Sequence, residues 1–207
     1  MDPQLTEYLT QQRWYAGRNR QLTDAQPALV EPLRADVDLV LLDLSYEDGP
    51  GERYQVVLRR GEGEVGDALG DPEVANLLLG LIAESATVGP VAFAAEPGAR
   101  LPVGAPSRVV GAEQSNTSVV FGEAAILKLF RRVTSGVNPD IELTRVLSRA
   151  GSPHVAPLLG TMSLEGGPAT ALGMVTRFAD NAAEGWDMAV ASTRDLYAEG
   201  DLYADEV

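Results

Sequence analysis

The 207-residue chain contains no cysteine and only one histidine, His154. The absence of cysteine excludes thiol catalysis, disulfide bonds and zinc sites built from thiolates, and it is typical of an intracellular protein. A single histidine cannot form a histidine cluster for a metal. Because His154 has no partner residues for proton transfer in the sequence, we expect it to be a loop residue rather than an acid–base group.

Positive charge is also scarce, since 16 Lys and Arg compare with 30 Asp and Glu, a net charge of −14. This balance disfavours nucleic-acid binding, because most of the surface repels a phosphate backbone. The N-terminus, MDPQLTEYL, lacks the basic and apolar regions of a signal peptide. The longest apolar runs, such as residues 37–44, have the length of a strand rather than of a membrane span. We therefore expect a cytoplasmic protein, with Lys128, Arg131 and Arg132 as candidates for a local phosphate site.

The most informative stretch is residues 113–142, EQSNTSVVFGEAAILKLFRRVTSGVNPDIE. Val119–Phe121 and Ile126–Phe130 read as two strands joined by a turn. Lys128 is unusual at the centre of the second run, because an ammonium group inside a small sheet requires an anionic partner. The alternative is that Lys128 is an edge residue whose ammonium group reaches solvent.

Polar residues flank this strand pair on both sides. The sequence Asn138-Pro139-Asp140 predicts a helix start, and Glu142 in its first turn could point back at Lys128. The loop formed by Ser115, Asn116, Thr117 and Ser118 could present backbone N–H groups to phosphate oxygens. A polar loop, a strand lysine and a helix glutamate, in this order, are typical of a kinase-like amino-terminal lobe. Taken singly, the loop is equally typical of a hairpin and the glutamate of a helix-dipole partner.

The segments EQSNTS, ILKLFRR, NPDIE and HVAPLLG together resemble the actinobacterial maltokinase family, including its glucosamine kinase relatives. The glycine-rich loop G-x-G-x-x-G of protein kinases is absent from the sequence. The resemblance implies ATP as the phosphoryl donor, with Mg²⁺ bound by residues of a carboxyl-terminal lobe that these 207 residues do not include. It implies phosphate contacts from Ser115, Asn116, Thr117, Ser118 and Lys128, with Glu142 orienting the lysine, and adenine contacts near Met174, Val175 and Thr176.

The remaining pattern predicts an α+β fold. We expect an amino-terminal cap over residues 1–95, with a curved antiparallel sheet and helices, a linker over 96–106, a kinase-like small lobe over 107–183, and a helix with an acidic tail over 184–207. The cap and the lobe are expected to have separate cores. Helices are predicted over residues 1–15, 71–86, 139–150 and 184–197, and strands over 29–46, 53–59, 88–95, 158–164 and 169–178.

The segment RWYAGRNR near the N-terminus has two interpretations. Arg13, Arg18 and Arg20 could bind a phosphate or a sugar. Alternatively, Trp14 and Tyr15 pack under the sheet, while the arginines are solvated or pair with nearby acids. The second interpretation is favoured, because amphipathic side chains of this kind usually have a packing role.

The sequence therefore predicts the amino-terminal part of an ATP-dependent sugar kinase. The most plausible acceptor is maltose, at its anomeric hydroxyl, and glucosamine is the rival. No HGD-type catalytic loop or downstream metal-binding Asp motif follows residue 184, so no catalytic residue is assigned and the 207 residues alone are expected to be inactive. The alternative is a non-catalytic module that caps or docks a partner such as trehalose synthase.

Overall fold

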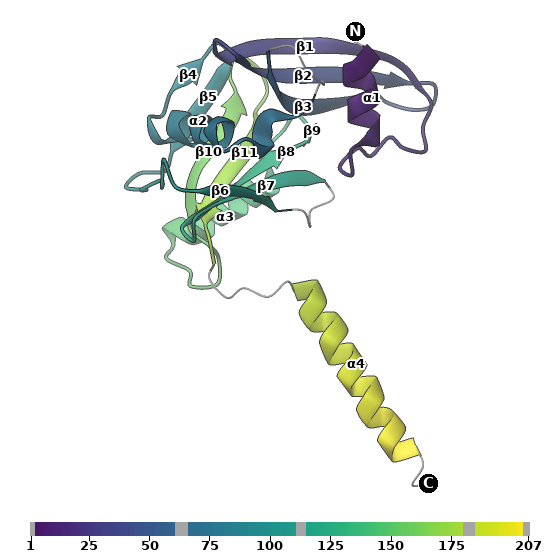
Figure 1. Cartoon of the computed structure of the whole chain (residues 1–207). Helices are drawn as coiled ribbons and strands as arrows, with labels where there is room; N and C mark the ends of the chain where they lie inside the picture. The colour runs from purple at the N-terminus through teal and green to yellow at the C-terminus, as the bar shows by residue number, and fades with distance from the viewer. Residues whose placement is uncertain (1–2, 61–65, 111–114, 180–184, 205–207) are drawn as a thin grey trace.

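The computed structural model describes residues 3–60, 66–110, 115–179 and 185–204. The chain forms an α+β fold built on antiparallel sheets, as predicted (Figure 1). Its first sheet has four strands in the order β1-β2-β3-β9, and its second has seven in the order β4-β5-β10-β11-β8-β7-β6. The strand bounds are β1 Leu22–Arg34, β2 Val37–Tyr46, β3 Glu52–Arg59, β4 Thr87–Val88, β5 Val91–Ala95, β6 Ser107–Val110, β7 Asn116–Phe121, β8 Ala125–Phe130, β9 Arg132–Val133, β10 Leu158–Leu164 and β11 Thr170–Arg177.

The helices mostly agree with the sequence pattern. They are α1 Pro3–Gln11, the short 3-10 helix η1 Ala68–Gly70, α2 Pro72–Ala83, α3 Pro139–Arg149 and α4 Gly185–Ala204. Both α2 and α3 begin as predicted, because the side chains of Asp71 and Asn138 accept hydrogen bonds from backbone N–H groups of the first turn and a proline follows each of them. The predicted strand over residues 29–46 is instead a hairpin of β1 and β2, which turns at residues 35–36.

The last helix, α4, is longer than predicted and lies apart from the rest of the described chain (Figure 1). It continues to Ala204, into the segment expected to be an acidic tail. Its apolar side chains Met188, Val190, Leu196 and Tyr197 are exposed. Among the described helices, none is both long and apolar enough to span a membrane.

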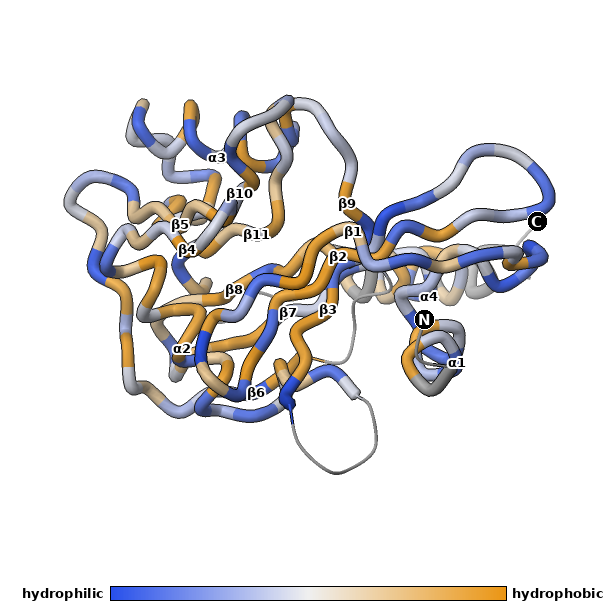
Figure 2. The backbone as a smooth tube through the Cα atoms, turned by 90° about the horizontal axis from the view of Figure 1, so that it is seen from above, coloured by the Kyte–Doolittle hydropathy of each residue, from blue (hydrophilic) through white to orange (hydrophobic). Residues whose placement is uncertain are grey.

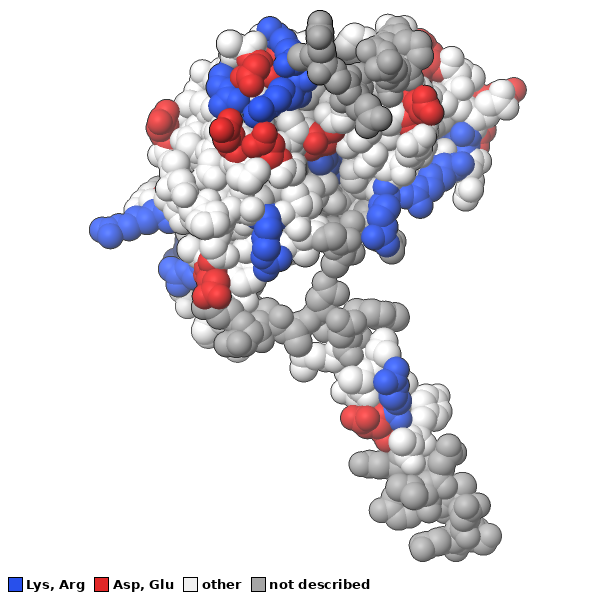
Figure 3. All heavy atoms as spheres, viewed as in Figure 1, with Lys and Arg blue, Asp and Glu red and all other residues white. Residues whose placement is uncertain are grey.

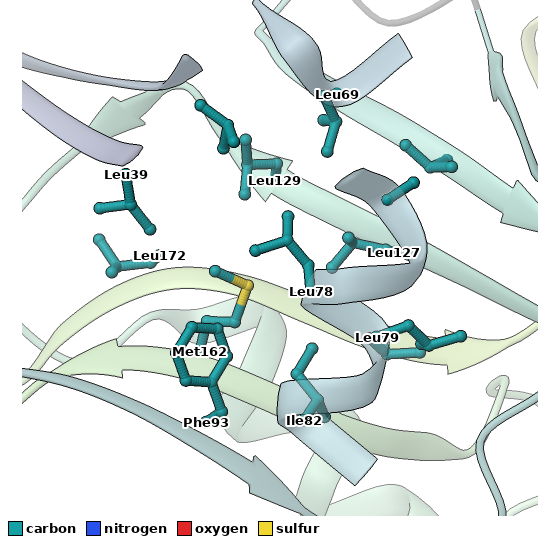
Figure 4. Packing of buried hydrophobic residues seen from close by; sticks show 14 of the residues in the cluster. Leu39, Leu69, Leu78, Leu79, Ile82, Phe93, Leu127, Leu129, Met162 and Leu172 are labelled. Atoms are coloured by element: carbon teal, nitrogen blue, oxygen red, sulfur yellow. The ribbon is translucent and has the colours of Figure 1, made fainter. Parts of the chain in front are cut away.

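The main core is shared by the predicted cap and the predicted lobe. Helix α2 covers the sheets with Leu78, Leu79 and Ile82, and Figure 4 shows these side chains beside Leu127 and Met162 of the later strands. The same buried cluster contains Leu39 of β2. In Figure 2 the hydrophobic stretches of β2 and β3 run through the middle of the fold. The prediction of two separate cores is therefore wrong.

Strand pairing also crosses the predicted boundary. β3 pairs with β9, with Arg53 opposite Val133, and β5 pairs with β10 over residues 91–95 and 160–164. The predicted linker packs on α2, since Asn76 Oδ1 accepts a hydrogen bond from the Gly104 N–H at 2.8 Å. The sequence pattern could not predict this pairing. The alternation of side chains along a strand shows which face is apolar, but it does not show which distant strand is the partner.

Gly160 lies at the point where α2 approaches β10 most closely. A Cβ built there would lie 2.4 Å from Ile82 Cγ2 and 2.8 Å from the Ala94 carbonyl oxygen. We predict that Gly160→Ala destabilises the whole chain by about 1–3 kcal/mol, because the added methyl group overpacks the shared core. Urea unfolding measures this change.

Gly167→Ala is the matched control. In the exposed turn between β10 and β11, a Cβ at residue 167 would meet no heavy atom within 4 Å, so the change should stay within about 0.5 kcal/mol. Equal stability of the two variants would mean that α2 and β10 do not share a close-packed core.

Candidate functional site

Residues of β7, β8 and β11 form a small pocket beside the first turns of α3. In the strand register Ser118 lies opposite Lys128, and Lys128 lies opposite Met174. Their side chains therefore share one face of the sheet, the face away from the main core. The pocket has a volume of about 260 Å³. We call it the Lys128 pocket, and it is lined by Ser118, Ile126, Lys128, Asp140, Thr144, Met174 and Thr176.

The prediction that Lys128 pairs with Glu142 is wrong, because the acidic residue beside Lys128 is Asp140. Lys128 Nζ lies 3.9 Å from Asp140 Oδ2. Glu142 instead lines a second and more apolar groove of about 490 Å³ on the other side of α3, between the helix and β10–β11. Because Lys128 and Asp140 are partly exposed, with 30% and 63% of their side-chain surface accessible, their pair contributes at most about 1 kcal/mol.

The helix geometry explains this difference. Ile141 is the buried residue of α3, and it packs with Phe130, Leu158 and Met174. Successive helical residues are separated by about 100°, so Asp140 and Glu142 lie on opposite sides of Ile141. Asp140 faces β8 with Thr144, whereas Glu142 faces β10 with Arg145.

The C-terminal half of α3 is held by Glu96. Its Oε1 accepts a hydrogen bond from Arg145 Nε at 2.6 Å, and its Oε2 accepts one from Arg149 Nη2 at 2.8 Å. Burial raises the pKa of Glu96, but these hydrogen bonds outweigh burial and hold the pKa below its ordinary value. This anchor is therefore complete above the ordinary carboxyl pKa and is lost as the pH falls through the lowered one. The helix otherwise leaves Leu143, Val146 and Leu147 exposed.

The predicted polar loop is mostly strand, because β7 begins at Asn116. Ser115 is exposed and accepts a hydrogen bond from Asn116 Nδ2 at 3.2 Å. The next two residues point to opposite faces of the sheet. Thr117 Oγ1 accepts a hydrogen bond from Arg131 Nε at 2.7 Å, whereas Ser118 Oγ faces the Lys128 pocket, is 2% exposed and has no hydrogen-bond partner among the described residues.

The predicted adenine-side residues also divide between two faces. Met174 and Thr176 line the Lys128 pocket, while the side chain of Val175 is fully buried in the main core. Its strand β11 is paired on both sides, with β10 and with β8. Val175 therefore contributes packing rather than a side-chain contact to the pocket.

The two arginines after β8 do not belong to the pocket either. Arg131 is 2% exposed and pairs with Asp67, and Arg132 pairs with Glu52 at 3.0 Å. Of the three predicted cations, only Lys128 lines the pocket. On the face in Figure 3, basic and acidic side chains likewise lie beside one another on the cap. Ion pairs within the cap include Arg34–Asp36, Arg59–Asp71 and Arg60–Asp38.

Arg131 is the centre of a buried polar cluster that the sequence did not indicate. Its Nη1 donates to Asp67 Oδ2 and to the Gln55 carbonyl oxygen, and its Cζ lies 4.9 Å from the centre of the Trp14 ring. With the Thr117 contact, these residues form what we call the Arg131 cluster, which is composed of Trp14, Gln55, Asp67, Thr117 and Arg131. No motif or spacing in the sequence marked Asp67, which the structure places at the N-cap of η1.

The RWYAGRNR segment has the packing role that was favoured. Trp14 and Tyr15 are buried beside Tyr54, at ring distances of 6.0 and 5.5 Å. Arg20 lies over the Tyr46 ring and pairs with Asp48, and Arg18 donates to the Gln12 carbonyl oxygen. Burial, followed by the hydrogen bond to Glu52, raises the pKa of Tyr54 to about 12, so its hydroxyl stays protonated.

Comparison with known proteins agrees with this architecture. Residues 8–95 match the model of the maltokinase N-terminal cap domain. The chain is also 30% identical over 196 residues to a glucosamine kinase of Streptacidiphilus jiangxiensis, covering 88% of this chain and 43% of the relative. These similarities support a maltokinase/glucosamine kinase-like family for the chain.

Solved structures show the same fold. A glucosamine kinase in complex with glucosamine, ADP and inorganic phosphate superimposes with a TM-score of 0.62 at 21% identity, covering 100% of this chain and 48% of that one. A second crystal form of glucosamine kinase gives a TM-score of 0.62 at 23% identity, with 97% and 46% covered. The chain thus spans less than half the length of the relatives that it matches.

We predict that Lys128 is coupled to Asp140 and not to Glu142. A double-mutant cycle with Lys128→Ala and Asp140→Asn should give a coupling energy of about 0.2–1 kcal/mol in urea unfolding at low salt. This coupling energy should fall at 1 M salt, because the added ions screen the two partly exposed charges.

The matched cycle combines Lys128→Ala with Glu142→Gln and should give no coupling, because Glu142 faces the other groove. A larger coupling to Glu142 than to Asp140 would overturn the assignment of the acidic partner.

Proposed function

We propose that the chain is the amino-terminal half of an ATP-dependent sugar kinase and that the Lys128 pocket holds part of the nucleotide. The observation that carries this proposal is the position of Lys128. Its ammonium group lies on a central strand, opposite a buried unpartnered serine and beside the first turn of a helix. A strand lysine at such a helix is the arrangement that binds nucleotide phosphates in kinases. Similarity to a maltokinase cap domain and to a glucosamine kinase supports the same reaction.

Within the pocket, each polar residue has a distinct task. Lys128 would pair with a phosphate oxygen, and Asp140 would keep the lysine oriented toward it. Ser118 Oγ is buried without a partner, a state that costs about 1–3 kcal/mol, and a ligand oxygen would remove that cost. Ser115 and Asn116 lie at the start of β7, where they can approach the same phosphates. The side chain of Thr117 points to the opposite face, where its hydroxyl accepts a hydrogen bond from Arg131, so a phosphate contact of Thr117 would come from its backbone.

The other end of the pocket suits the adenosine portion of the nucleotide. Ile126, Met174 and Thr176 provide an apolar surface with one hydroxyl. The volume of about 260 Å³ is smaller than the roughly 300–1,000 Å³ of typical ligand pockets. The pocket is therefore half of a cleft, and a carboxyl-terminal lobe would complete it.

Mg²⁺ accompanies ATP in phosphoryl transfer, where it neutralises charge on the β- and γ-phosphates. In the part of the chain that the structure describes, no three His, Asp or Glu side chains gather in a way that suits a metal. The described residues thus do not fit a magnesium site, and we derive no step of the reaction through the ion.

Two sugar acceptors are supported by different observations. The cap domain is of the maltokinase type, which supports maltose with transfer to its anomeric hydroxyl. The curated relative and the superimposed structures are glucosamine kinases, and one of these structures contains glucosamine and ADP, which supports glucosamine. Docking onto trehalose synthase as a non-catalytic module stays a prediction from the family resemblance.

We predict that the 207 residues alone do not phosphorylate either sugar. Lys128 and Ser118 provide a phosphate contact but no carboxylate that orients the acceptor hydroxyl, and an open half-cleft leaves the nucleotide in water. The purified chain is incubated with ATP, Mg²⁺ and maltose or glucosamine, and ADP release is followed. Sugar-dependent release at about 1–100 s⁻¹, the usual range for kinases, would contradict the proposal.

The same assay applied to the chain joined to a carboxyl-terminal lobe tests the lysine. Lys128→Ala should abolish sugar-dependent ADP release. Arg132→Ala is the matched control. Arg132 is a basic residue four positions after Lys128, but it pairs with Glu52 and does not line the pocket. This variant should therefore retain activity.

A further inference from the structure

We propose that the cap sets the nucleotide affinity of the lobe through the Arg131 cluster, with Asp67 as a positioning residue for Lys128 and Ser118. This inference rests on the proposed nucleotide site. It assigns to the cap a task in binding, beyond its contribution to the shared core. Asp67 lies outside the Lys128 pocket and acts on it only through Arg131.

The first step of the argument is the position of the cluster on the strand pair. Arg131 directly follows β8, three residues after Lys128, which is about 10 Å along a strand. Its Nε donates to Thr117, the immediate neighbour of Ser118 on β7. The cluster therefore contacts both strands of the hairpin, β7 beside Ser118 and the chain just after β8, three residues from Lys128.

The second step is the division of faces. Side chains alternate along a strand, so Thr117 points to the cap side while Ser118 points to the pocket. The direct cross-strand partner of Ser118 is Lys128. A shift of Thr117 or Arg131 on the cap side consequently moves the backbone that carries Ser118 and Lys128.

The third step is the rigidity of the anchor on the cap. Asp67 Oδ1 accepts a hydrogen bond from the Leu69 N–H at 2.9 Å, and its Oδ2 accepts one from the Val57 N–H at 3.1 Å in addition to Arg131. The side chains of Asp67 and Arg131 are only 7% and 2% exposed. Because a buried arginine cannot leave its carboxylate without becoming an uncompensated charge, the pair has one well-defined geometry.

Gln55 forms a second link between the cap and the lobe. Its Nε2 donates to the Leu172 carbonyl oxygen of β11 at 2.9 Å, and its N–H donates to the Arg131 carbonyl oxygen at 2.7 Å. The cap is thus hydrogen-bonded directly to Arg131 after β8 and to β11, and through Arg131 to Thr117 of β7. These three strands line the pocket.

Coupling between two sites is reciprocal, so nucleotide binding should also change the environment of the residues in the Arg131 cluster. Trp14 provides the reporter, because its ring packs against Arg131. The sequence contains only one other tryptophan, Trp186. A Trp186→Phe chain therefore has emission from Trp14 alone.

The experiment titrates MgADP into the Trp186→Phe chain and follows Trp14 emission, with calorimetry as an independent measure of binding. We expect a saturable change in emission that Lys128→Ala abolishes. Asp67→Asn in the same background should weaken MgADP binding by about tenfold, within the roughly 5- to 150-fold range of coupled sites. Circular dichroism confirms that each variant is folded at the temperature of the titration.

Asp38→Asn is the matched control. Asp38 is a similarly buried carboxylate, but its partner is Arg60, so the pair lies entirely within the cap. A merely structural effect of losing a buried cap carboxylate would weaken binding equally in both variants. If Asp67→Asn fails to fold, Thr117→Val removes one acceptor of Arg131 while the ion pair stays, and it should weaken binding in the same direction.

The outcomes separate the inference from the proposed function. Two results would overturn the role of the cluster but not the nucleotide site. In the first, calorimetry detects MgADP binding while Trp14 emission stays unchanged. In the second, Asp67→Asn and Asp38→Asn bind MgADP with equal affinity. Absence of binding at millimolar MgADP in this chain and also in the chain joined to a carboxyl-terminal lobe would overturn the nucleotide site itself, and with it the inference.

Discussion

The pairing of Arg131 with Asp67 is the interaction on which the rest of the structure depends. Both side chains are almost completely buried, and each comes from a different part of the chain, the end of β8 and the start of η1. Removing one partner of such a pair costs about 3–5 kcal/mol, because the other charge is left buried. The pair can form only when the cap and the lobe are assembled together, which links their folding to one event.

The shared apolar core also joins the cap to the lobe. Helix α2 belongs to the segment that matches a cap domain, yet its buried face shares a core with strands β8 and β10, which lie outside that segment. Burial of each large aliphatic side chain contributes roughly 1.5–3 kcal/mol, so separating the two parts would expose apolar side chains of both. A match to a domain family thus defines a segment of sequence and does not by itself define an independent core.

By contrast, α3 is held loosely at defined points. Ile141 is its buried contact, Asp140 approaches Lys128 at one end, and Glu96 binds two arginines at the other. These polar contacts are partly exposed, so they contribute little stability.

Local patterns predicted what depends on local chemistry. The two apolar runs around Lys128 correctly indicated two strands, and Asn138-Pro139 correctly indicated the start of α3. The acidic partner was missed, because Asp140 and Glu142 differ only in the side of Ile141 on which they lie, and packing decides which side faces β8. Arg131 was missed for a similar reason, since adjacent arginines look alike in sequence while one is buried and the other exposed.

The central claim is that the cap and the lobe form one cooperative unit. Native-state hydrogen exchange of the 207-residue chain tests it most directly, by comparing backbone amides of β2 and β3 with those of β8 and β11 over a range of denaturant concentrations. The account predicts one opening free energy and one denaturant dependence for the slowest amides of all four strands. If the amides of β2 and β3 open with a clearly different free energy from those of β8 and β11, the cap and the lobe unfold separately and the account is contradicted.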